Sequence, residues 1–445
     1  MRGTWRRTAQ PRGSRGRDVQ TATYTTWVGT VVQLESTAAR RASRASAAGR
    51  ARRRRRSPSK TALVLGGGGL TGAVYEIGAL RALDLLSVNR SVTDFDVYVG
   101  TSAGAFVSAM TANGISPEEM MRVLNRQVPT AFPDVDLGAV LALNVRELIS
   151  SAIQFPFRAA ALTWRALGQL GQVSALDVVL GLAAGMPSGL YDGRGIERYV
   201  REVLSDGGRT DDFRALEREL YVTATDLDSC ERIVFGAPGF DAVPISTAVR
   251  ASTALPMVYQ PVRVGDRELV DGGIVSTTNL DIAIDAGARL VVVVNPLVPY
   301  VNDRRDGRRR RVSEMGFPRI GYQTFKLMAH ERLHAQARQW EQRYPGVDIV
   351  LIEPELDDEL MFRTSIMDFS SRTAIARHGF RSVTVKLAED YPRLKRVAAK
   401  HGIEISATRV RKVVRHFAAQ TEQPARWRAI LEQTRTALLR QSAND

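Results

Sequence analysis

The sequence predicts an α/β fold with three layers, in which helices cover both faces of a mainly parallel central sheet. Two strand-turn-helix units follow one another between Thr61 and Gly114, and such repetition is typical of parallel sheets. Short apolar runs that fit buried strands then recur as far as Pro354. With 445 residues, of which 44% are hydrophobic, the chain is long enough to bury a large core.

The first two units are the clearest. Thr61–Leu65 reads as a short buried strand, four consecutive glycines follow at Gly66–Gly69, and apolar residues recur at helical spacing over Gly72–Leu86. Phe95–Gly100 predicts the next strand, and Thr101–Gly114 predicts a helix that an Asn-Gly pair closes. Both strands therefore end at a glycine-containing turn that begins a helix.

The remaining elements continue this pattern after an interruption. Residues 137–191 are rich in Leu, Ala and aromatic side chains and predict short helices outside the sheet, which we interpret as a lid. A long helix is expected over residues 317–343, and the charged residues 356–445 predict a helical C-terminal extension to a main domain at 58–355. Further strands are expected at 219–226, 231–236, 267–273, 289–296 and 347–354.

The net charge of +15 is concentrated at the N-terminus. Residues 1–57 contain 15 arginines against Asp18 and Glu35, which gives +13 and leaves +2 for the rest of the chain. Because this segment has few apolar residues, we expect a disordered tail that can bind anionic lipid headgroups at a membrane surface. Aromatic residues are not interleaved with the arginines of the dense stretch Arg40–Arg56, which makes nucleic acid an unlikely partner.

Targeting signals and cysteine usage indicate a cytoplasmic protein. The apolar stretch Thr23–Leu34 is interrupted by threonines and a glycine, so we expect no secretory signal peptide. No run of 18 apolar residues predicts a membrane-spanning helix. The single cysteine, Cys230, excludes an internal disulfide and suits a reducing compartment. The basic tail allows peripheral attachment to the membrane.

The segment Gly100–Gly104, GTSAG, fits the pattern G-x-S-x-G between a predicted strand and a predicted helix. A sharp turn there lifts the Ser102 hydroxyl above the sheet, where it can act as a nucleophile. Such a serine needs a base. The histidines all come late in the chain, and His330 and His334, four residues apart among charged residues, fit an exposed helical face better than a metal site.

Asp271 is the alternative base, because it ends a predicted strand and is followed by Gly272 and Gly273. An aspartate has an ordinary pKa near 3.9, so it can take a serine proton only if the oxyanion formed at the same time is strongly stabilised. Bare amides of the glycine row at a helix N-terminus supply such stabilisation. The sequence therefore predicts an acyl-transfer site built from three separated segments.

The order glycine row, G-x-S-x-G, then D-G-G resembles the patatin-like phospholipase family. The segments Ala251–Val262 and Met186–Val200 are also similar to parts of that family, and the resemblance extends from about Lys60 to Glu355. It implies hydrolysis of lipid acyl esters through an acyl-serine intermediate, with a lipid ester as substrate and with no metal or organic cofactor. The residues that it implies are the nucleophile Ser102, its base Asp271, the oxyanion-hole glycines Gly67, Gly68 and Gly69, and the motif glycines Gly72, Gly100, Gly104, Gly272 and Gly273.

One position departs from the family pattern. Thr71 stands where the family usually has arginine or lysine in the glycine loop, so a fixed positive charge near the oxyanion or headgroup is missing. This departure leaves open a second hypothesis, a catalytically weak lipid-binding or regulatory module with the same fold.

Nucleotide-binding chemistries fit the glycine row less well. A phosphate-binding P-loop requires a lysine followed by serine or threonine, whereas alanine and valine follow the last glycine. Gly67, Gly69 and Gly72 match the glycine spacing of a dinucleotide fold. That fold also needs an acidic residue at the end of the second strand, and Asp94 and Asp96 stand at its start.

Overall fold

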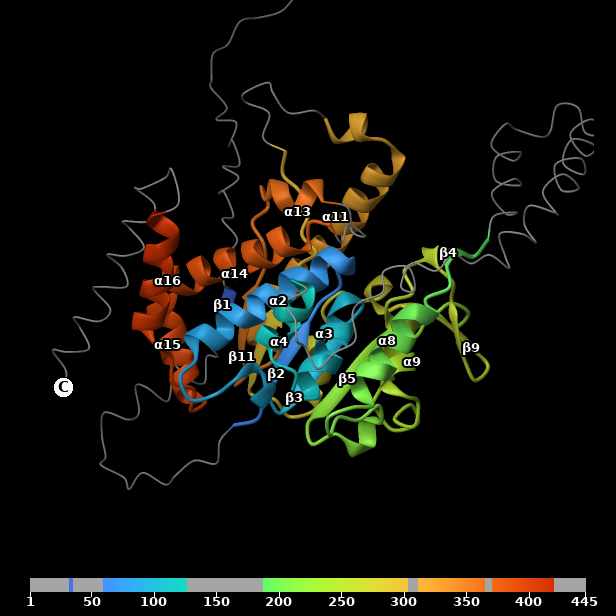
Figure 1. Ribbon diagram of the computed structural model, residues 1–445, viewed down its shortest axis with the longest axis horizontal. Coiled ribbons are helices and arrows are strands. Elements are labelled where there is room, and N and C mark those ends of the chain that lie inside the picture. Colours follow the sequence, from blue (N-terminus) through green and yellow to red (C-terminus); the bar gives the residue numbers. More distant parts are fainter. Residues whose placement is uncertain (1–31, 35–58, 126–186, 303–310, 365–369, 420–445) are drawn as a thin grey trace, which may run out of the picture.

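A mainly parallel β-sheet runs between two layers of helices, which confirms the predicted fold class (Figure 1). The structure is a computed structural model and describes residues 32–34, 59–125, 187–302, 311–364 and 370–419. Within these residues the sheet has nine strands. The expected lid at 137–191 lies outside the described residues except for its last five positions.

Five parallel strands form the centre of the sheet. Their order across the sheet is β11 (Asp348–Ile352), β10 (Leu290–Val294), β2 (Thr61–Leu65), β3 (Val97–Thr101) and β5 (Glu219–Asp226). Beyond β5 the pairing becomes antiparallel, with β9 (Arg267–Asp271), β8 (Val262–Val264) and β6 (Arg232–Phe235). Each of the central and flanking strands expected from the sequence is present, with its ends shifted by three residues or fewer.

The N-terminal segment corrects one expectation. Val32–Leu34, within the segment predicted to be disordered, form strand β1, which pairs with β11 in antiparallel orientation. Two apolar residues flank a glutamine in this strand, and the edge of β11 offers unpaired backbone groups to any such segment. The other residues of 1–57 and the first after it lie outside the described part of the chain.

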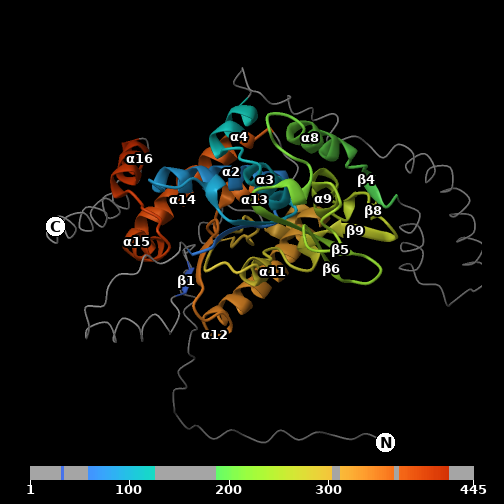
Figure 2. The ribbon, with the colours of Figure 1, turned by 90° about the horizontal axis from the view of Figure 1, so that it is seen from below.

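Successive side chains of the central strands point alternately into two hydrophobic clusters, because these strands are buried on both faces. In β2, Leu63 and Leu65 belong to one cluster and Ala62 and Val64 to the other. The first cluster is covered by α2 (Gly69–Leu86), α3 (Ala103–Ala112), α4 (Pro117–Leu124), α8 (Arg194–Leu204), α9 (Ile245–Ser252) and α14 (Arg372–Glu389). The second is covered by α10 (Leu280–Asp285), α11 (Phe317–Ala337) and α12 (Trp340–Arg343). Figure 2 shows α11 and α12 on the opposite face of the sheet.

Helix α14 crosses α2 at unusually close range. A Cβ placed on Gly78 of α2 would lie 2.3 Å from the carbonyl oxygen of Ala376, and one on Gly379 of α14 would lie 2.6 Å from the carbonyl oxygen of Tyr75. The two glycines therefore let the backbones touch. Helix α14 thus covers the core of the main domain. The other late helices are α13 (Glu359–Arg363), α15 (Tyr391–Lys400) and α16 (Ala407–Ala419).

The remaining elements are short. A two-stranded sheet joins β4 (Gly189–Tyr191) to β7 (Met257–Tyr259). The 3₁₀ turns are η1 (Val92–Asp94), η2 (Phe213–Ala215), η3 (Gly272–Ile274) and η4 (Val312–Met315). The helix expected over residues 317–343 is divided between α11 and α12.

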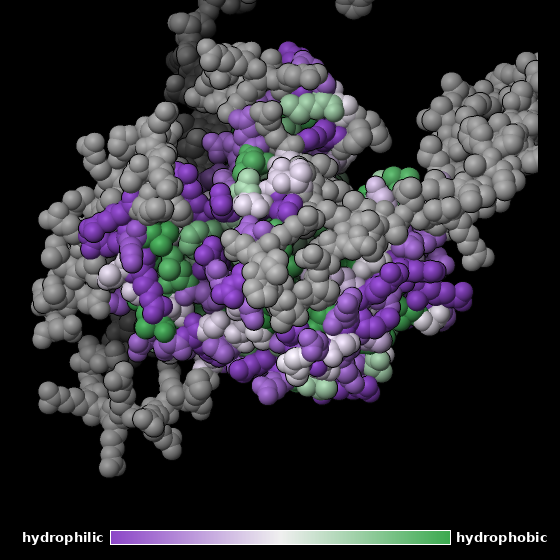
Figure 3. Space-filling view, in the orientation of Figure 1, coloured by the Kyte–Doolittle hydropathy of each residue, from purple (hydrophilic) through white to green (hydrophobic). Residues whose placement is uncertain are grey.

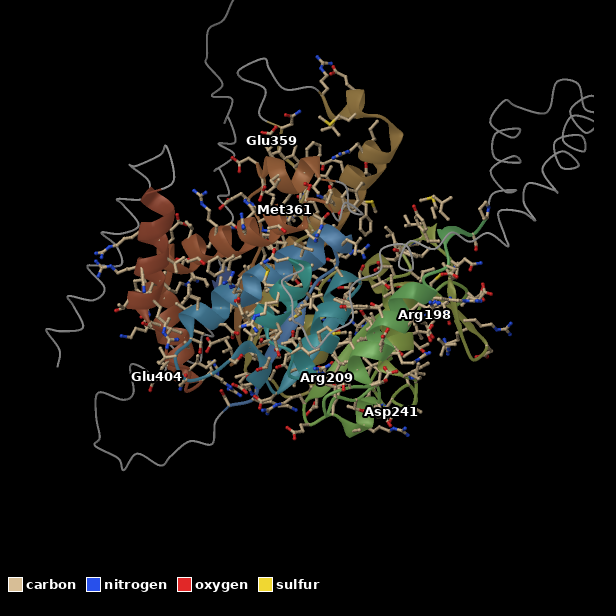
Figure 4. The ribbon with its side chains drawn as sticks, viewed as in Figure 1. Arg198, Arg209, Asp241, Glu359, Met361 and Glu404 are labelled. Carbon is tan, nitrogen blue, oxygen red and sulfur yellow. The ribbon has the colours of Figure 1, made fainter. Side chains whose placement is uncertain are left out.

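On the face shown in Figure 3 the described residues form a largely hydrophilic surface, with apolar side chains in small separate areas. Figure 4 marks two exposed charged residues on opposite sides of that view, Arg198 on α8 and Glu404 after α15. None of the helices within the described residues is long and apolar enough to cross a membrane.

Candidate active site

Ser102 lies at the turn between β3 and α3, with a left-handed φ of 54°. Its backbone amide donates a hydrogen bond of 2.8 Å to Oγ of Ser252 in α9, which holds this strained turn from outside. The glycines on both sides are needed for space. A Cβ on Gly104 would lie 2.2 Å from the carbonyl oxygen of Leu65, and one on Gly100 would lie 2.5 Å from Cα of Ala105.

The structure brings Ser102 and Asp271 together. Oγ of Ser102 donates a hydrogen bond to Oδ2 of Asp271 at 2.5 Å. The register of the sheet explains the meeting, because Thr101 pairs with Thr223 on β5, and the next residue of β5, Ala224, pairs with Asp271 on β9. The serine and the aspartate are therefore level with each other across one intervening strand.

The carboxylate of Asp271 is buried, with 4% of the residue exposed. Its other oxygen, Oδ1, accepts a hydrogen bond of 2.7 Å from the amide of Gly273, so the D-G-G turn orients the side chain. Burial raises the pKa of Asp271 to about 6, although the hydrogen bonds from Ser102 and Gly273 act in the opposite direction. A carboxylate with this pKa is a stronger base than an exposed aspartate.

The glycine row faces Ser102, but its three amides are not equivalent. The amide of Gly67 donates to the carbonyl oxygen of Thr277 at 3.2 Å, so the expectation of three bare amides is wrong at this position. Within the described residues the amides of Gly68 and Gly69 make no hydrogen bond, and they lie at the N-terminus of α2. A Cβ on Gly67 would lie 3.5 Å from Cβ of Ser102, an ordinary van der Waals distance, so Gly67 lies directly beside the serine.

Two further residues of the candidate site, Ala103 and Ser252, belong to none of the three sequence motifs as predicted site residues. The amide of Ala103, the residue after the serine, is also without a hydrogen bond to any described residue. It stands at the N-terminus of α3, where the general geometry of nucleophile turns places an oxyanion donor. Ser252 is the second, since its hydroxyl fixes the Ser102 backbone. Knowledge of nucleophile turns suggests Ala103 from the sequence, whereas only the folded chain reveals Ser252.

An apolar cavity of about 170 Å³ begins at Ser102 and Asp271. It continues along α3 past Phe106 and Met110 and is closed by side chains of α2, α4 and α8. Its lining includes Leu70, Val74, Ile77, Ile115, Met120, Val123, Leu124, Ile196, Tyr199, Val203, Tyr259, Leu297, Tyr322 and Phe325. Most of these lining side chains are apolar, so the cavity beside Ser102 and Asp271 suits an apolar chain.

Thr71 does not face this cavity. The residue is 4% exposed and belongs to the first turn of α2, whereas its neighbour Leu70 is among the residues that line the cavity. The threonine is therefore part of the packing around α2.

The helical pair His330 and His334 does not lie on an exposed face, which corrects the expectation from the sequence. Both residues are half-buried on α11, and Nε2 of His334 lies 2.9 Å from Oε2 of the buried Glu353. Glu353 directly follows β11, so the carboxylate that contacts His334 comes from the next strand and not from the helix itself. Charged neighbours along the helix could not reveal this contact.

Comparison with known proteins supports this reading of the chain. Residues 63–284 match the model of the family described as patatin-like phospholipase. A curated relative, the uncharacterized protein YqhO of Bacillus subtilis (strain 168), is 25% identical over 288 residues, which are 62% of this chain and 83% of YqhO.

Solved structures give two further likenesses. VipD from Legionella pneumophila has 15% identity and a TM-score of 0.35, with 75% of this chain and 67% of VipD covered. Human GIVD cytosolic phospholipase A2, in complex with methyl gamma-linolenyl fluorophosphonate, has 11% identity and a TM-score of 0.35, with 77% of this chain and 59% of the human chain covered. The family match encloses the glycine row, the serine turn and the D-G-G segment. The chain therefore contains a patatin-like phospholipase domain over residues 63–284.

Proposed function

We propose that this protein hydrolyses carboxylic esters of lipids through a dyad of Ser102 and Asp271. The observation that carries the proposal is the hydrogen bond of 2.5 Å between Oγ of Ser102 and Oδ2 of Asp271 at the end of an apolar cavity. The family of the domain supports a lipid hydrolase as the class of enzyme.

In the first half of the reaction, Oγ of Ser102 attacks the ester carbonyl carbon while its proton passes to Asp271. The carbonyl oxygen becomes an oxyanion, which the amides of Gly68, Gly69 and Ala103 stabilise from the N-termini of α2 and α3. Each such donor contributes about 3 kcal/mol in known oxyanion holes. When the intermediate collapses, the bond to the alcohol breaks and Asp271 returns the proton to the alcohol, which leaves an acyl-serine.

In the second half, water attacks the acyl-serine. Asp271 accepts a proton from the water, the same amides stabilise the second oxyanion, and the carboxylic acid leaves as Ser102 recovers its proton from Asp271. The raised pKa of Asp271, about 6, suits both directions of transfer because the group is ionised at neutral pH and can still hold a proton transiently.

The cavity indicates the acyl part of the substrate. Met110 follows Ser102 by eight residues, and α3 rises about 1.5 Å per residue, so the apolar path extends roughly 12 Å from the nucleophile. Its lining is mostly apolar, which favours a hydrocarbon chain over a peptide or sugar.

We further propose that the basic N-terminal segment holds the enzyme at anionic membranes. Each arginine near an anionic surface contributes about 1 kcal/mol. Replacing the arginines of Arg50–Arg56 by glutamine keeps β1 intact and should reduce sedimentation with vesicles that contain phosphatidylserine. Equal sedimentation of the two proteins would remove the tail from this role.

The dyad is tested with a fluorophosphonate probe and with p-nitrophenyl esters. The wild-type protein should be labelled and should turn over esters, whereas Ser102→Ala should abolish both and Asp271→Asn should abolish turnover. Ser108→Ala is the control, because Ser108 is also fully buried on α3 but lies outside the site. Turnover that survives Ser102→Ala would refute the dyad, and a wild-type protein that binds lipid vesicles without any turnover would favour the lipid-binding module.

A further inference from the structure

A second cluster of chemically capable side chains lies outside the dyad. His330 and His334 of α11 and Glu353 after β11 each offer one ligand atom, and these three atoms lie within 4.8 Å of one another. The two imidazole rings are 4.0 Å apart between centroids. The cluster therefore combines side chains from α11 with one from the carboxyl end of β11.

We propose that His330, His334 and Glu353 bind a zinc ion. Two imidazole nitrogens and one carboxylate oxygen are a common ligand set of Zn²⁺, and histidines four residues apart on a helix point to the same side. Zinc bonds of about 2.0–2.1 Å place tetrahedral ligands roughly 3.3 Å apart, so small side-chain rotations bring the three atoms to bonding geometry.

The state of His330 supports the site. Its Nδ1 is buried and has no hydrogen-bond partner within the described residues, which is costly for a polar atom unless something satisfies it. The neighbouring His334 already lies 2.9 Å from Glu353 through Nε2. A metal ion that displaces this contact would join all three side chains and satisfy the histidines together.

The carboxylate of Glu353 is already oriented as a ligand. Its Oε1 accepts a hydrogen bond of 2.8 Å from Nδ2 of Asn295, the residue after β10, which leaves Oε2 directed at the histidines. Hydrogen bonds of this kind fix metal-binding carboxylates in other sites. The ammonium group of Lys386 is bound to the backbone carbonyl of Glu353 and lies 3.6 Å from Glu355, which balances its charge.

The site also has access and an open position. Both histidines are only half-buried, so an ion can enter from the solvent side of α11. Three protein ligands leave a fourth position for water or another small ligand. Glu331 is exposed between the two histidines in sequence and takes no part in the cluster, which makes it a useful comparison.

The test uses the full-length protein after treatment with a chelator and dialysis. Zn²⁺ is added in competition with a chromophoric chelator, and bound metal is also counted by mass spectrometry. The wild-type protein should bind one equivalent, and Co²⁺ in its place should give the visible absorption of a tetrahedral site. His330→Gln and Glu353→Gln should each weaken binding about a hundredfold or more, and Asn295→Ala about tenfold to a hundredfold.

Glu331→Gln and His378→Gln are the controls and should bind as the wild type does. His378 is a half-buried histidine that contacts Asp358 instead of this cluster. Circular dichroism verifies that each variant folds, and the shift of its melting temperature with added Zn²⁺ is a second readout that the ligand variants should lose. Zinc affinity that is the same in wild type and His330→Gln, or absence of binding to the wild type at micromolar Zn²⁺, would overturn the proposal.

Discussion

Oγ of Ser102 and Oδ2 of Asp271, 169 positions apart in the chain, lie 2.5 Å from each other. The contact places a hydroxyl against a carboxylate whose pKa burial has raised to about 6. No histidine takes part in this contact, so the pH behaviour of the proposed reaction depends on the aspartate.

The first prediction concerns pH. Asp271 accepts a proton only when it is ionised, so kcat/KM should be level above pH 7 and fall about tenfold per pH unit below pH 6. An aspartate with an ordinary pKa would keep its activity down to about pH 4. The measurement is kcat/KM for a short-chain ester from pH 4 to pH 9. An acid limb near pH 4 would contradict the assignment.

The second prediction concerns the support of the serine turn. Ser252→Ala leaves the buried amide of Ser102 without its partner, which should cost about 1–3 kcal/mol in the free energy of unfolding. Because the nucleophile then loses its fixed position, kcat should also fall. Ser108→Ala is the matched control, since the Ser108 hydroxyl is buried without a hydrogen-bond partner among the described residues. Denaturant unfolding and ester kinetics decide the matter, and equal effects of both substitutions would exclude this role for Ser252.

The third prediction concerns acyl length. Met110→Trp fills the cavity about two turns of α3 beyond Ser102 and should lower kcat/KM for long-chain esters about tenfold or more, because overpacking costs about 1–3 kcal/mol. A four-carbon ester does not extend that far and serves as the internal control. The comparison is made with p-nitrophenyl esters of increasing length. A loss that is the same for every length would show that the chain binds elsewhere.

The fourth prediction concerns the crossing of α2 and α14. Gly78→Ala places a Cβ 2.3 Å from the backbone oxygen of Ala376, so the helices must separate, at a cost of about 3 kcal/mol. Gly321→Ala in α11 meets open space and should instead stabilise the protein by about 1 kcal/mol. Thermal unfolding of the two variants measures the contrast. Similar melting temperatures would mean that α14 does not rest on α2 as described.

Much of the fold could be predicted because local sequence determines it. The central strands are short apolar runs buried on both faces, and Thr61–Leu65 and Glu219–Asp226 have the predicted ends. The turn after Gly100 could be predicted as well, since glycines are required wherever another backbone comes within van der Waals distance. These features depend on the pattern of apolar residues along each strand and on the space available around single glycines.

Contacts between distant segments could not be predicted in the same way. The sequence alone predicted strand, turn and helix, the serine at the turn and the family to which the domain belongs. The tertiary structure alone decided that the Gly67 amide is used by Thr277, that β1 pairs with β11, and that Glu353 covers the two histidines. The physical reason is that each of these contacts depends on which element packs against a given face, and local periodicity carries no information about the partner.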